Sequence, residues 1–253
     1  DCPAGIIYLP KGTGCATITI HSGALWRFMK REKEMRVCFL TSGFPDGFNA
    51  DFERVLKSYL PDRTGGGNLV FIVSDFADVE GNPRWAAEVR RQFEEIGVQF
   101  SGFKIIDHTV SGGQAEDYIR QAQVVWLSGG DTPRQMESFR AYHLRERLQD
   151  FDGIVIGMSV GSINMADRVV LARDVRENVP EMQIYQGLGL VQINIEPHLN
   201  PSDTEHQRDI WEASRHTPVY GLFDGSFILV DGERTELFGP YCLYNLQNQE
   251  TII

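Results

Sequence analysis

The segment Gly157–Gly161 (GMSVG) has the spacing G-x-S-x-G of a nucleophile elbow, with Ser159 at its centre. It directly follows the apolar run 153–156 (GIVI), whose β-branched residues predict a buried strand. The glycines let the chain turn sharply into a helix, which would leave the serine exposed at the positive helix end. Because an unactivated serine is a poor nucleophile, the motif predicts a base and an orienting acid elsewhere in the chain.

The candidate base is His198, which follows the apolar run 190–195. Sites in open α/β sheets form outside the carboxyl ends of strands, so a histidine at a strand end is well placed for chemistry. His108 also follows a strand-like run, and an ordinary loop histidine bonded to backbone is the alternative for His198. Position alone therefore favours His198 only slightly.

The candidate acid is Asp224, which ends the apolar run 219–223 and precedes Gly225. A carboxylate at this place would hold the imidazole in the right tautomer and stabilise its protonated form. An ordinary Asp-Gly turn is the alternative, because this dipeptide is common in turns.

A second glycine-containing turn, Gly129–Thr132 (GGDT), also lies between a strand-like run and a helix. A serine hydrolase needs two N–H donors aimed at the developing oxyanion. The backbone of Val160, directly after the serine, would supply one donor and that of Gly130 the other. A tight turn with Asp131 or Thr132 as the helix cap is compatible with this role.

Strand and helix patterns alternate from Met35 onward. The first predicted strands are 36–41, 68–74, 103–107, 123–128 and 153–158, and the predicted helices are 49–60, a segment opening at Asn82-Pro83, 114–122 and 133–149. In the helix after Asn82, the residues expected to face the core are Trp85, Val89, Phe93 and Ile96. Later strands are expected at 169–172, 190–196, 219–223, 227–230 and 236–238, with an Asp231-Gly232 hairpin turn. This order predicts an α/β fold, with a mostly parallel sheet flanked by helices.

The bulk composition limits the classes of function. The 253 residues are 42% hydrophobic and 11% aromatic, enough for a sizeable core, and the net charge is −11. An acidic chain argues against nucleic acid and anionic membranes as partners, because both need a basic surface. The four cysteines form no C-x-x-C pair, so no metal site is expected. Their wide spacing leads us to expect a reduced, cytoplasmic protein. The lack of an 18-residue apolar stretch argues against a transmembrane helix.

Residues 1–34 differ from the rest, because they contain two of the four cysteines and show no clean period. Arg31–Glu34 (REKE) would be encoded by purine-rich codons, as a bacterial ribosome-binding site is. We interpret 1–34 as an extension that is not native, with Met35 as the native start and 35–253 as a single domain. A genuine N-terminal strand or arm is the alternative.

Four segments occur in one order: Gly129–Thr132, Gly157–Gly161, Ile195–His198 (IEPH) and Leu222–Ser226 (LFDGS). With these spacings, the chain from about Phe39 onward resembles the serine peptidase family of dipeptidase E (aspartyl dipeptidase) and cyanophycinase. The resemblance implies a flavodoxin-like sheet in a three-layer sandwich, related to class I glutamine amidotransferases. It also implies the triad order Ser, His, acid, whereas typical α/β-hydrolases have the order Ser, acid, His.

The resemblance assigns roles residue by residue. Ser159 matches the nucleophile of a G-x-S-A-G motif, His198 the histidine of an I-N-P-H segment, and Asp224 the carboxylate of a P-E-G segment. Gly130 and Val160 match the oxyanion donors. Valine at 160 replaces an alanine, and aspartate at 224 replaces a glutamate. The acid arm is thus one methylene shorter, so its backbone must approach the histidine more closely.

The expected substrate contacts differ from those of the dipeptidases. The resemblance implies an arginine, in the helix after the histidine, that grips the aspartyl carboxylate of the substrate. The nearest equivalent here is Glu205, which would repel an acidic side chain, and Arg208 lies nearby, where it also fits a helix surface. Strict Asp-X specificity is therefore not expected. Gly-Gly-Asp also resembles the cyanophycinase loop, but Thr132 stands where that loop usually has glutamine.

These residues together predict a serine peptidase that cleaves dipeptides or short peptides without a metal or cofactor. Its expected partner is a small peptide substrate, and a homodimer is left open. An esterase or amidase with the same triad is one alternative. The other is a catalytically inactive relative that binds a small molecule or a partner.

Overall fold

The computed structural model describes residues 36–60 and 67–246. Contacts within the chain group Met35–Ile253 into one unit, and the fold below is that of this unit by itself. The expectations for residues 1–34, with Met35 as the native start, lie outside the described residues.

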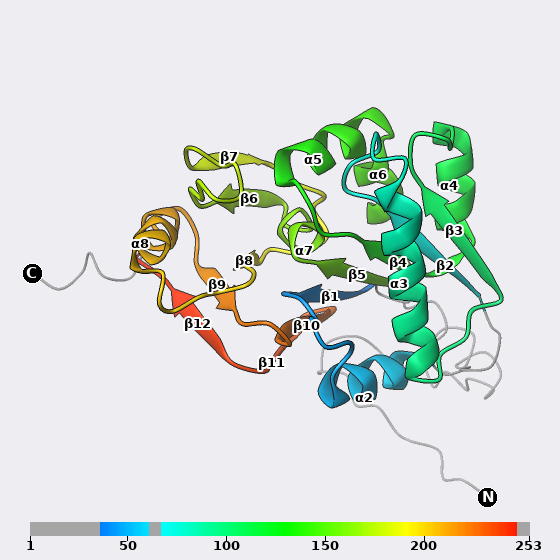
Figure 1. Cartoon of the computed structure of the whole chain (residues 1–253), viewed down its shortest axis with the longest axis horizontal. Helices are drawn as coiled ribbons and strands as arrows, with labels where there is room; N and C mark the ends of the chain where they lie inside the picture. The colour runs from blue at the N-terminus through cyan, green and yellow to red at the C-terminus, as the bar shows by residue number, and fades with distance from the viewer. Residues whose placement is uncertain (1–35, 61–66, 247–253) are drawn as a thin grey trace, which may run out of the picture. The chain divides into compact units, whose positions relative to one another are not determined.

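A central sheet of seven strands has the order β11-β10-β1-β5-β4-β2-β3 (Figure 1). Its parallel strands are β1 (Val37–Thr41), β2 (Asn68–Ile72), β3 (Gly102–Ile106), β4 (Ala122–Leu127) and β5 (Ile154–Met158). β10 (Phe227–Asp231) pairs antiparallel with β1 and, through the expected hairpin, with β11 (Arg234–Phe238). The carboxyl ends of β1, β4 and β5 therefore lie side by side at one edge of the sheet.

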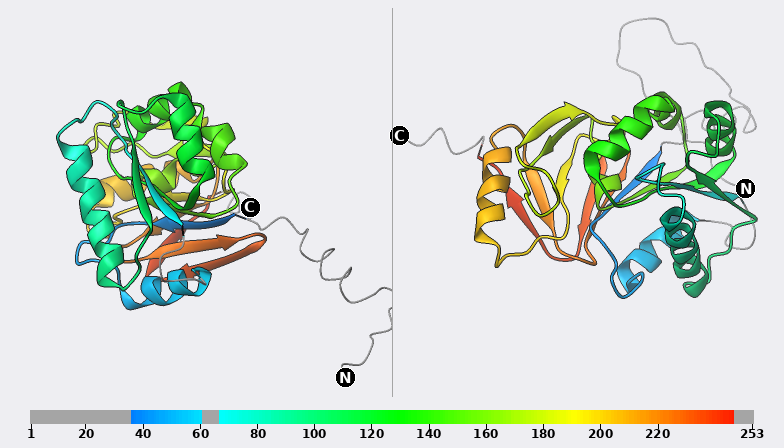
Figure 2. Two further views of the ribbon diagram at one scale, coloured as in Figure 1. Left: turned by 90° about the vertical axis from the view of Figure 1, so that its right-hand side faces the viewer. Right: turned by 45° about the horizontal axis from the view of Figure 1, so that its top comes forward.

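Helices cover both faces of this sheet (Figure 2). One face carries α2 (Ala50–Tyr59) and α3 (Gly81–Glu95), and the other carries α4 (Gly112–Arg120), α5 (Thr132–Ala141) and α6 (Leu144–Gln149). The mostly parallel, three-layer α/β architecture expected from the sequence is confirmed.

Aromatic side chains fill the layer between the sheet and the helices α2 and α3. Phe93 of α3 packs edge-on against Trp126 of β4, with ring centroids 5.9 Å apart. The other members of this layer are Phe39, Phe44, Phe48, Phe52 and Phe227. Because β1, β2, β4 and β5 are mostly buried, their register is fixed, and their carboxyl ends form a rigid platform.

Two smaller sheets extend from this platform. β6 (Arg168–Leu171) pairs with β7 (Gln183–Gln186), and the other sheet has the order β12-β9-β8. The members of the latter are β8 (Asn194–Glu196), β9 (Val219–Leu222) and β12 (Tyr241–Tyr244). α8 (Thr204–Ala213) packs on it through a second apolar cluster, whose buried members are Val170, Ala172, Leu199, Ile210, Ala213, Val219 and Tyr244. This second cluster supports the segments that carry His198 and Asp224.

Three details differ from the sequence predictions. The helix expected over 133–149 is two helices, because His143 adopts a left-handed conformation with φ 52° and ends α5. Trp85 was expected in the core but is 56% exposed, since the buried stripe of α3 is centred on Ala86, Val89 and Phe93. The strand expected over 190–196 is confined to β8.

Among the helices of residues 36–60 and 67–246, none combines the length and the apolar character of a membrane span.

Candidate active site

Ser159 lies at the sharp turn between β5 and the short helix α7 (Val160–Ile163), with φ 51° and ψ −114°. This backbone is strained for a non-glycine residue, by about 1–3 kcal/mol, and persists only where surrounding contacts fix it. The Ser159 N–H donates to the Thr41 carbonyl at 2.9 Å, and its own carbonyl accepts from the Ser162 N–H at 2.9 Å. The end of β1 and the first turn of α7 thus hold the elbow in place.

The glycines of the elbow allow close approach of neighbouring backbone. A β-carbon on Gly161 would lie 2.2 Å from the Leu127 carbonyl oxygen, and one on Gly157 would lie 2.6 Å from the Ser162 nitrogen. The buried Ser162 hydroxyl accepts from the Thr41 N–H at 2.8 Å and donates to the Thr41 carbonyl at 2.9 Å. This reciprocal pair joins α7 to β1, and the motif alone did not indicate it.

His198 and Asp224 meet although they follow different strands. His198 Nδ1 lies 2.6 Å from Asp224 Oδ1. β8 and β9 are parallel neighbours, with Glu196 opposite Gly221, so both residues leave the same end of this sheet. A carboxylate on Nδ1 fixes that nitrogen as the proton donor and leaves Nε2 as the basic nitrogen.

Ser42 and Gly43, directly after β1, form the seat of the His198–Asp224 pair. The buried Ser42 Oγ accepts from the His198 N–H at 2.7 Å and lies 3.3 Å from Asp224 Oδ1. A β-carbon on Gly43 would lie only 2.7 Å from His198 Cε1. Since Thr41 binds the Ser159 backbone and Ser42 binds that of His198, both residues lie at the end of β1. The sequence analysis did not identify Ser42. The signal that could have indicated it is a small polar residue that precedes a glycine at the end of a strand.

Gly130 lies in the turn after β4, next to the elbow. Its φ is +147°, and a β-carbon there would lie 2.1 Å from Ser74 Oγ, so glycine is required. A β-carbon on the adjacent Gly129 would lie 3.4 Å from Ser159 Cβ. Of the acceptors in residues 36–60 and 67–246, none takes the N–H groups of Gly130 and Val160. Both groups are therefore free to bind an added oxygen atom.

A buried polar brace connects the Gly130 turn with the elbow helix. Gln135 of α5 donates from Nε2 to the Ser128 carbonyl at 2.7 Å. Asn164, at the end of α7, donates from Nδ2 to Gln135 Oε1 at 2.9 Å and accepts from the Tyr185 hydroxyl at 2.8 Å. Burial raises the pKa of Tyr185, which keeps this hydroxyl a donor. The brace sets the spacing between the segments that carry Gly130 and Val160.

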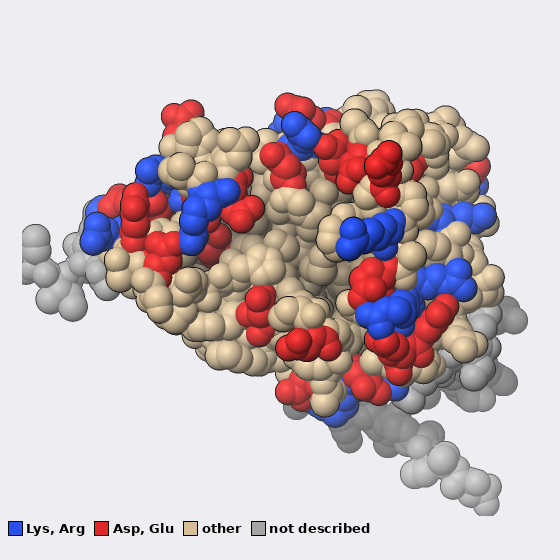
Figure 3. Space-filling view, viewed as in Figure 1, with Lys and Arg blue, Asp and Glu red and all other residues tan. Residues whose placement is uncertain are grey.

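Glu205 and Arg208, the predicted substrate contacts, both lie on α8 and are exposed. Glu205 Oε1 lies 3.3 Å from Arg173, a residue of the loop after β6 that sequence reasoning missed. Arg173 also pairs with Asp209 at 3.0 Å. Acidic and basic side chains are intermixed over α8, as Figure 3 shows. An arginine therefore does lie against Glu205, but two carboxylates already neutralise it.

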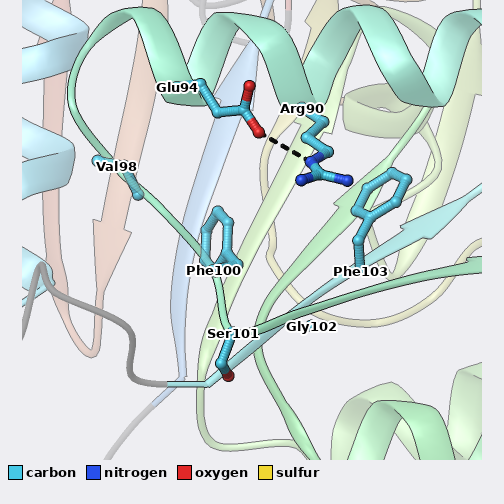
Figure 4. Close-up of a pocket in the computed structure, with 7 residues that line it drawn as sticks. All are labelled: Arg90, Glu94, Val98, Phe100, Ser101, Gly102 and Phe103. Atoms are coloured by element: carbon cyan, nitrogen blue, oxygen red, sulfur yellow. Dashed lines mark hydrogen bonds and ion pairs between the residues drawn. The ribbon is translucent and has the colours of Figure 1, made fainter.

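A cavity of about 110 Å³ lies between the last turns of α3 and the start of β3 (Figure 4). Arg90 and Glu94 of α3 border it and pair with each other, opposite Phe103. Binding sites for small ligands commonly enclose about 300–1,000 Å³. This cavity is smaller and lies at the amino end of β3, whereas Ser159, His198 and Asp224 lie at carboxyl strand ends.

Comparison with known proteins places these features in a family. The model of peptidase family S51 matches residues 42–238. Peptidase E of Streptomyces coelicolor is 27% identical over 197 residues, which are 73% of this chain and 75% of that protein.

Two solved structures share the fold. A protein of Listeria monocytogenes EGD-e, provisionally described as a Peptidase E protein, has a TM-score of 0.61 at 19% identity, over 81% of this chain and 98% of that one. A peptidase from an acI-B1 actinobacterium has a TM-score of 0.61 at 14% identity, over 83% of this chain and 91% of that one.

Proposed function

The chain belongs to peptidase family S51 and is a serine-type peptidase, and on this premise we propose that it hydrolyses dipeptides or short peptides through Ser159, His198 and Asp224. The observation that carries the proposal is the 2.6 Å contact between His198 and Asp224, held at the same end of β1 as the strained Ser159. This is the composition and order of a serine triad, in which base and acid are positioned before substrate arrives.

In the proposed reaction, Ser159 Oγ attacks the peptide carbonyl while His198 Nε2 takes its proton. Asp224 keeps Nδ1 protonated and stabilises the imidazolium that forms. The amine leaves with the proton from Nε2, and an acyl group stays on Ser159. A water molecule then gives its proton to the same nitrogen and releases the acid, which restores the serine.

We assign the oxyanion to the N–H groups of Gly130 and Val160. The carbonyl oxygen becomes negatively charged in each tetrahedral intermediate, and two fixed donors stabilise that charge more than they stabilise the substrate. The closeness of Gly129 to Ser159 and the free state of both N–H groups support this assignment. Removing one such donor typically costs about 10²–10³ in kcat.

The charges on α8 bear on which peptides fit. Arg173 is already paired with Glu205 and Asp209. Its guanidinium is therefore not available to pair with an acidic side chain of the substrate. We expect peptides with neutral or basic side chains to be cleaved in preference to Asp-X peptides, with Glu205 in the selective contact. Arg208, one turn further along the helix, is the candidate for contact with a free substrate carboxylate.

Profiling a library of dipeptides and tripeptides by mass spectrometry tests this proposal, with a panel of p-nitrophenyl esters run beside it. We expect cleavage of short peptides, absent in Ser159→Ala, with Asp-X peptides among the poor substrates. Cleavage of esters alone would move the function to an esterase. No turnover of either panel would favour a relative that only binds.

A further inference from the structure

Three nearly buried titratable side chains meet beside the triad, and the mechanism above makes no use of them. They are His206 of α8, Glu196 at the end of β8 and Asp174 in the loop after β6, with side chains 11%, 12% and 13% exposed. His206 Nε2 lies 3.2 Å from Glu196 Oε1 and 3.7 Å from Asp174 Oδ2. Within the described residues, no group of His, Cys, Asp and Glu side chains has an arrangement that could hold a metal ion.

The contacts of His206 are satisfied by a charged ring beside an ionised Glu196. Its Nδ1 lies 3.0 Å from the Arg173 carbonyl oxygen, while Nε2 faces the Glu196 carboxylate. A carbonyl and a carboxylate only accept hydrogen bonds, so both contacts are satisfied only when both ring nitrogens carry protons. Burial by itself would lower the pKa of His206, but the hydrogen bond and charge of Glu196 and the charge of Asp174 raise it to about 8.

The surrounding charges tie three segments of the chain together. Arg176 pairs with Asp174 at 3.1 Å and also with Asp203, which caps α8 by accepting from the His206 N–H at 3.0 Å. The remaining charged or titratable groups around the cluster are Arg173, Glu205 and Asp209 on its outer side and Tyr244 of β12 next to Glu196. When His206 loses its proton, the positive charge that lies next to both the Glu196 and the Asp174 carboxylates is removed.

Glu196 is two residues before His198, which connects the cluster to the proposed base. Their link is Pro197, whose ring restricts the backbone, and His198 itself has a left-handed φ of 53°. Such a conformation needs support from both sides. Ser42 supports the His198 N–H, and the His206–Glu196 pair anchors the preceding strand end. Burial raises the pKa of Glu196, the hydrogen bond and charge of His206 lower it, and the charge of His198 lowers it to a smaller extent.

We propose that the His206 imidazolium is a positioning residue that anchors Glu196, and through it the strained backbone of His198, so that peptidase activity falls when His206 is deprotonated. The proposal rests on the function assigned above to His198. It predicts that peptidase activity falls at alkaline pH because a residue outside the triad, His206, loses its proton.

The pH profile of kcat and KM for one cleaved peptide tests this proposal in three proteins. The wild type should lose kcat above about pH 8, with little change in KM. His206→Gln should have a kcat about tenfold lower at neutral pH, because the base is misplaced, and no alkaline loss of its own. His216→Gln removes a histidine outside the cluster and should retain the wild-type profile. Wild-type kcat or an unchanged alkaline loss in His206→Gln would overturn the proposal.

A readout independent of catalysis covers the case in which His206→Gln fails to fold. Imidazole NMR signals of the wild-type protein should show His206 titrating near pH 8 and the His198 signals moving in the same step. Glu196→Gln keeps the side-chain shape and removes the charge, so it should shift the His206 titration to lower pH. A neutral His206 at pH 7, or His198 signals that ignore its titration, would contradict the proposal even if Ser159 proved not to be the nucleophile.

Discussion

The His198 side chain is half-exposed, and a small number of contacts set its position. Asp224 Oδ1 lies 2.6 Å from its Nδ1, and Ser42 Oγ lies 2.7 Å from its backbone nitrogen. Gly43 lies close to the ring as well, because a β-carbon there would lie 2.7 Å from Cε1 of His198. At the scale of the residue, the proposed chemistry therefore depends on a ring held by contacts from β1 and β9, and small changes there should be costly.

Gly43→Ala should disturb this ring directly. The added methyl group overlaps Cε1, so the imidazole must shift, and we expect kcat to fall about 10²-fold while the protein stays folded. Gly113→Ala is the matched control, because a β-carbon there meets nothing within 4 Å, and it should leave kcat unchanged. Steady-state kinetics on one peptide measures both variants. Equal kcat in the two variants would show that the seat is looser than its distances indicate.

Asp224→Asn should test the proposed role of the acid. An amide can present a donor to Nδ1 and so favour the wrong tautomer of His198, and we expect kcat to fall about 10³–10⁴-fold with a normal fold. Steady-state kinetics of the variant and of the wild type at neutral pH give the measurement. A loss smaller than about tenfold would point to another partner for His198.

At the scale of the element, the two proposed oxyanion donors belong to separate segments that must keep a fixed spacing. The brace joins α5, α7 and β7, and in it Gln135 and Asn164 are buried while Tyr185 is half-buried. Its geometry matters because an oxyanion hole stabilises the intermediate only when both donors point to the same oxygen.

Asn164→Leu should remove the brace while filling its volume. The Gln135 and Tyr185 groups would lose their partner, and we expect the free energy of unfolding to fall by about 1–3 kcal/mol. We also expect kcat to fall more than KM changes, because the donors act on the intermediate. Tyr185→Phe leaves the Asn164–Gln135 bond intact and should have the smaller effect on both. Urea unfolding and steady-state kinetics give the comparison, and a Tyr185→Phe variant worse than Asn164→Leu would contradict it.

The sequence predicted the elements of the platform because each parallel strand is a short apolar run that ends in glycine, serine or a charged residue. It also indicated Ser159, His198 and Asp224, whose catalytic roles remain predictions. It did not indicate Ser42 or the pairing of His206 with Glu196, because these contacts depend on the register between β1, β8, β9 and α8. The break at His143 was missed because only its left-handed backbone, and no glycine or proline, marks it.

At the scale of the whole molecule, ionised side chains that accept or donate hydrogen bonds in the fold make stability depend on pH. The pKa of His206 is raised from 6.5 to about 8, so its contribution to stability is complete below pH 6.5 and is lost as the pH rises through 8. The backbone N–H groups of Ala77 and His206 lower the pKa values of Asp75 and Asp203. Those contributions are present above the ordinary value of 3.8 and are lost as the pH falls through the lowered values.

The melting temperature of the wild type should therefore fall as the pH rises from 6.5 to about 9, by more than it does in His206→Gln. Differential scanning calorimetry at a series of pH values measures this difference. His216→Gln should melt with the wild-type pH dependence. A melting temperature with the same slope in the wild type and in His206→Gln would show that the imidazolium contributes nothing to folding.

The role of Ser159 as the nucleophile of a serine-type peptidase is tested by the kcat/KM of Ser159→Ala on the peptide that the wild type cleaves best. We expect kcat/KM to fall about 10⁴-fold or more, with an unchanged melting temperature. Turnover equal to that of the wild type would contradict it.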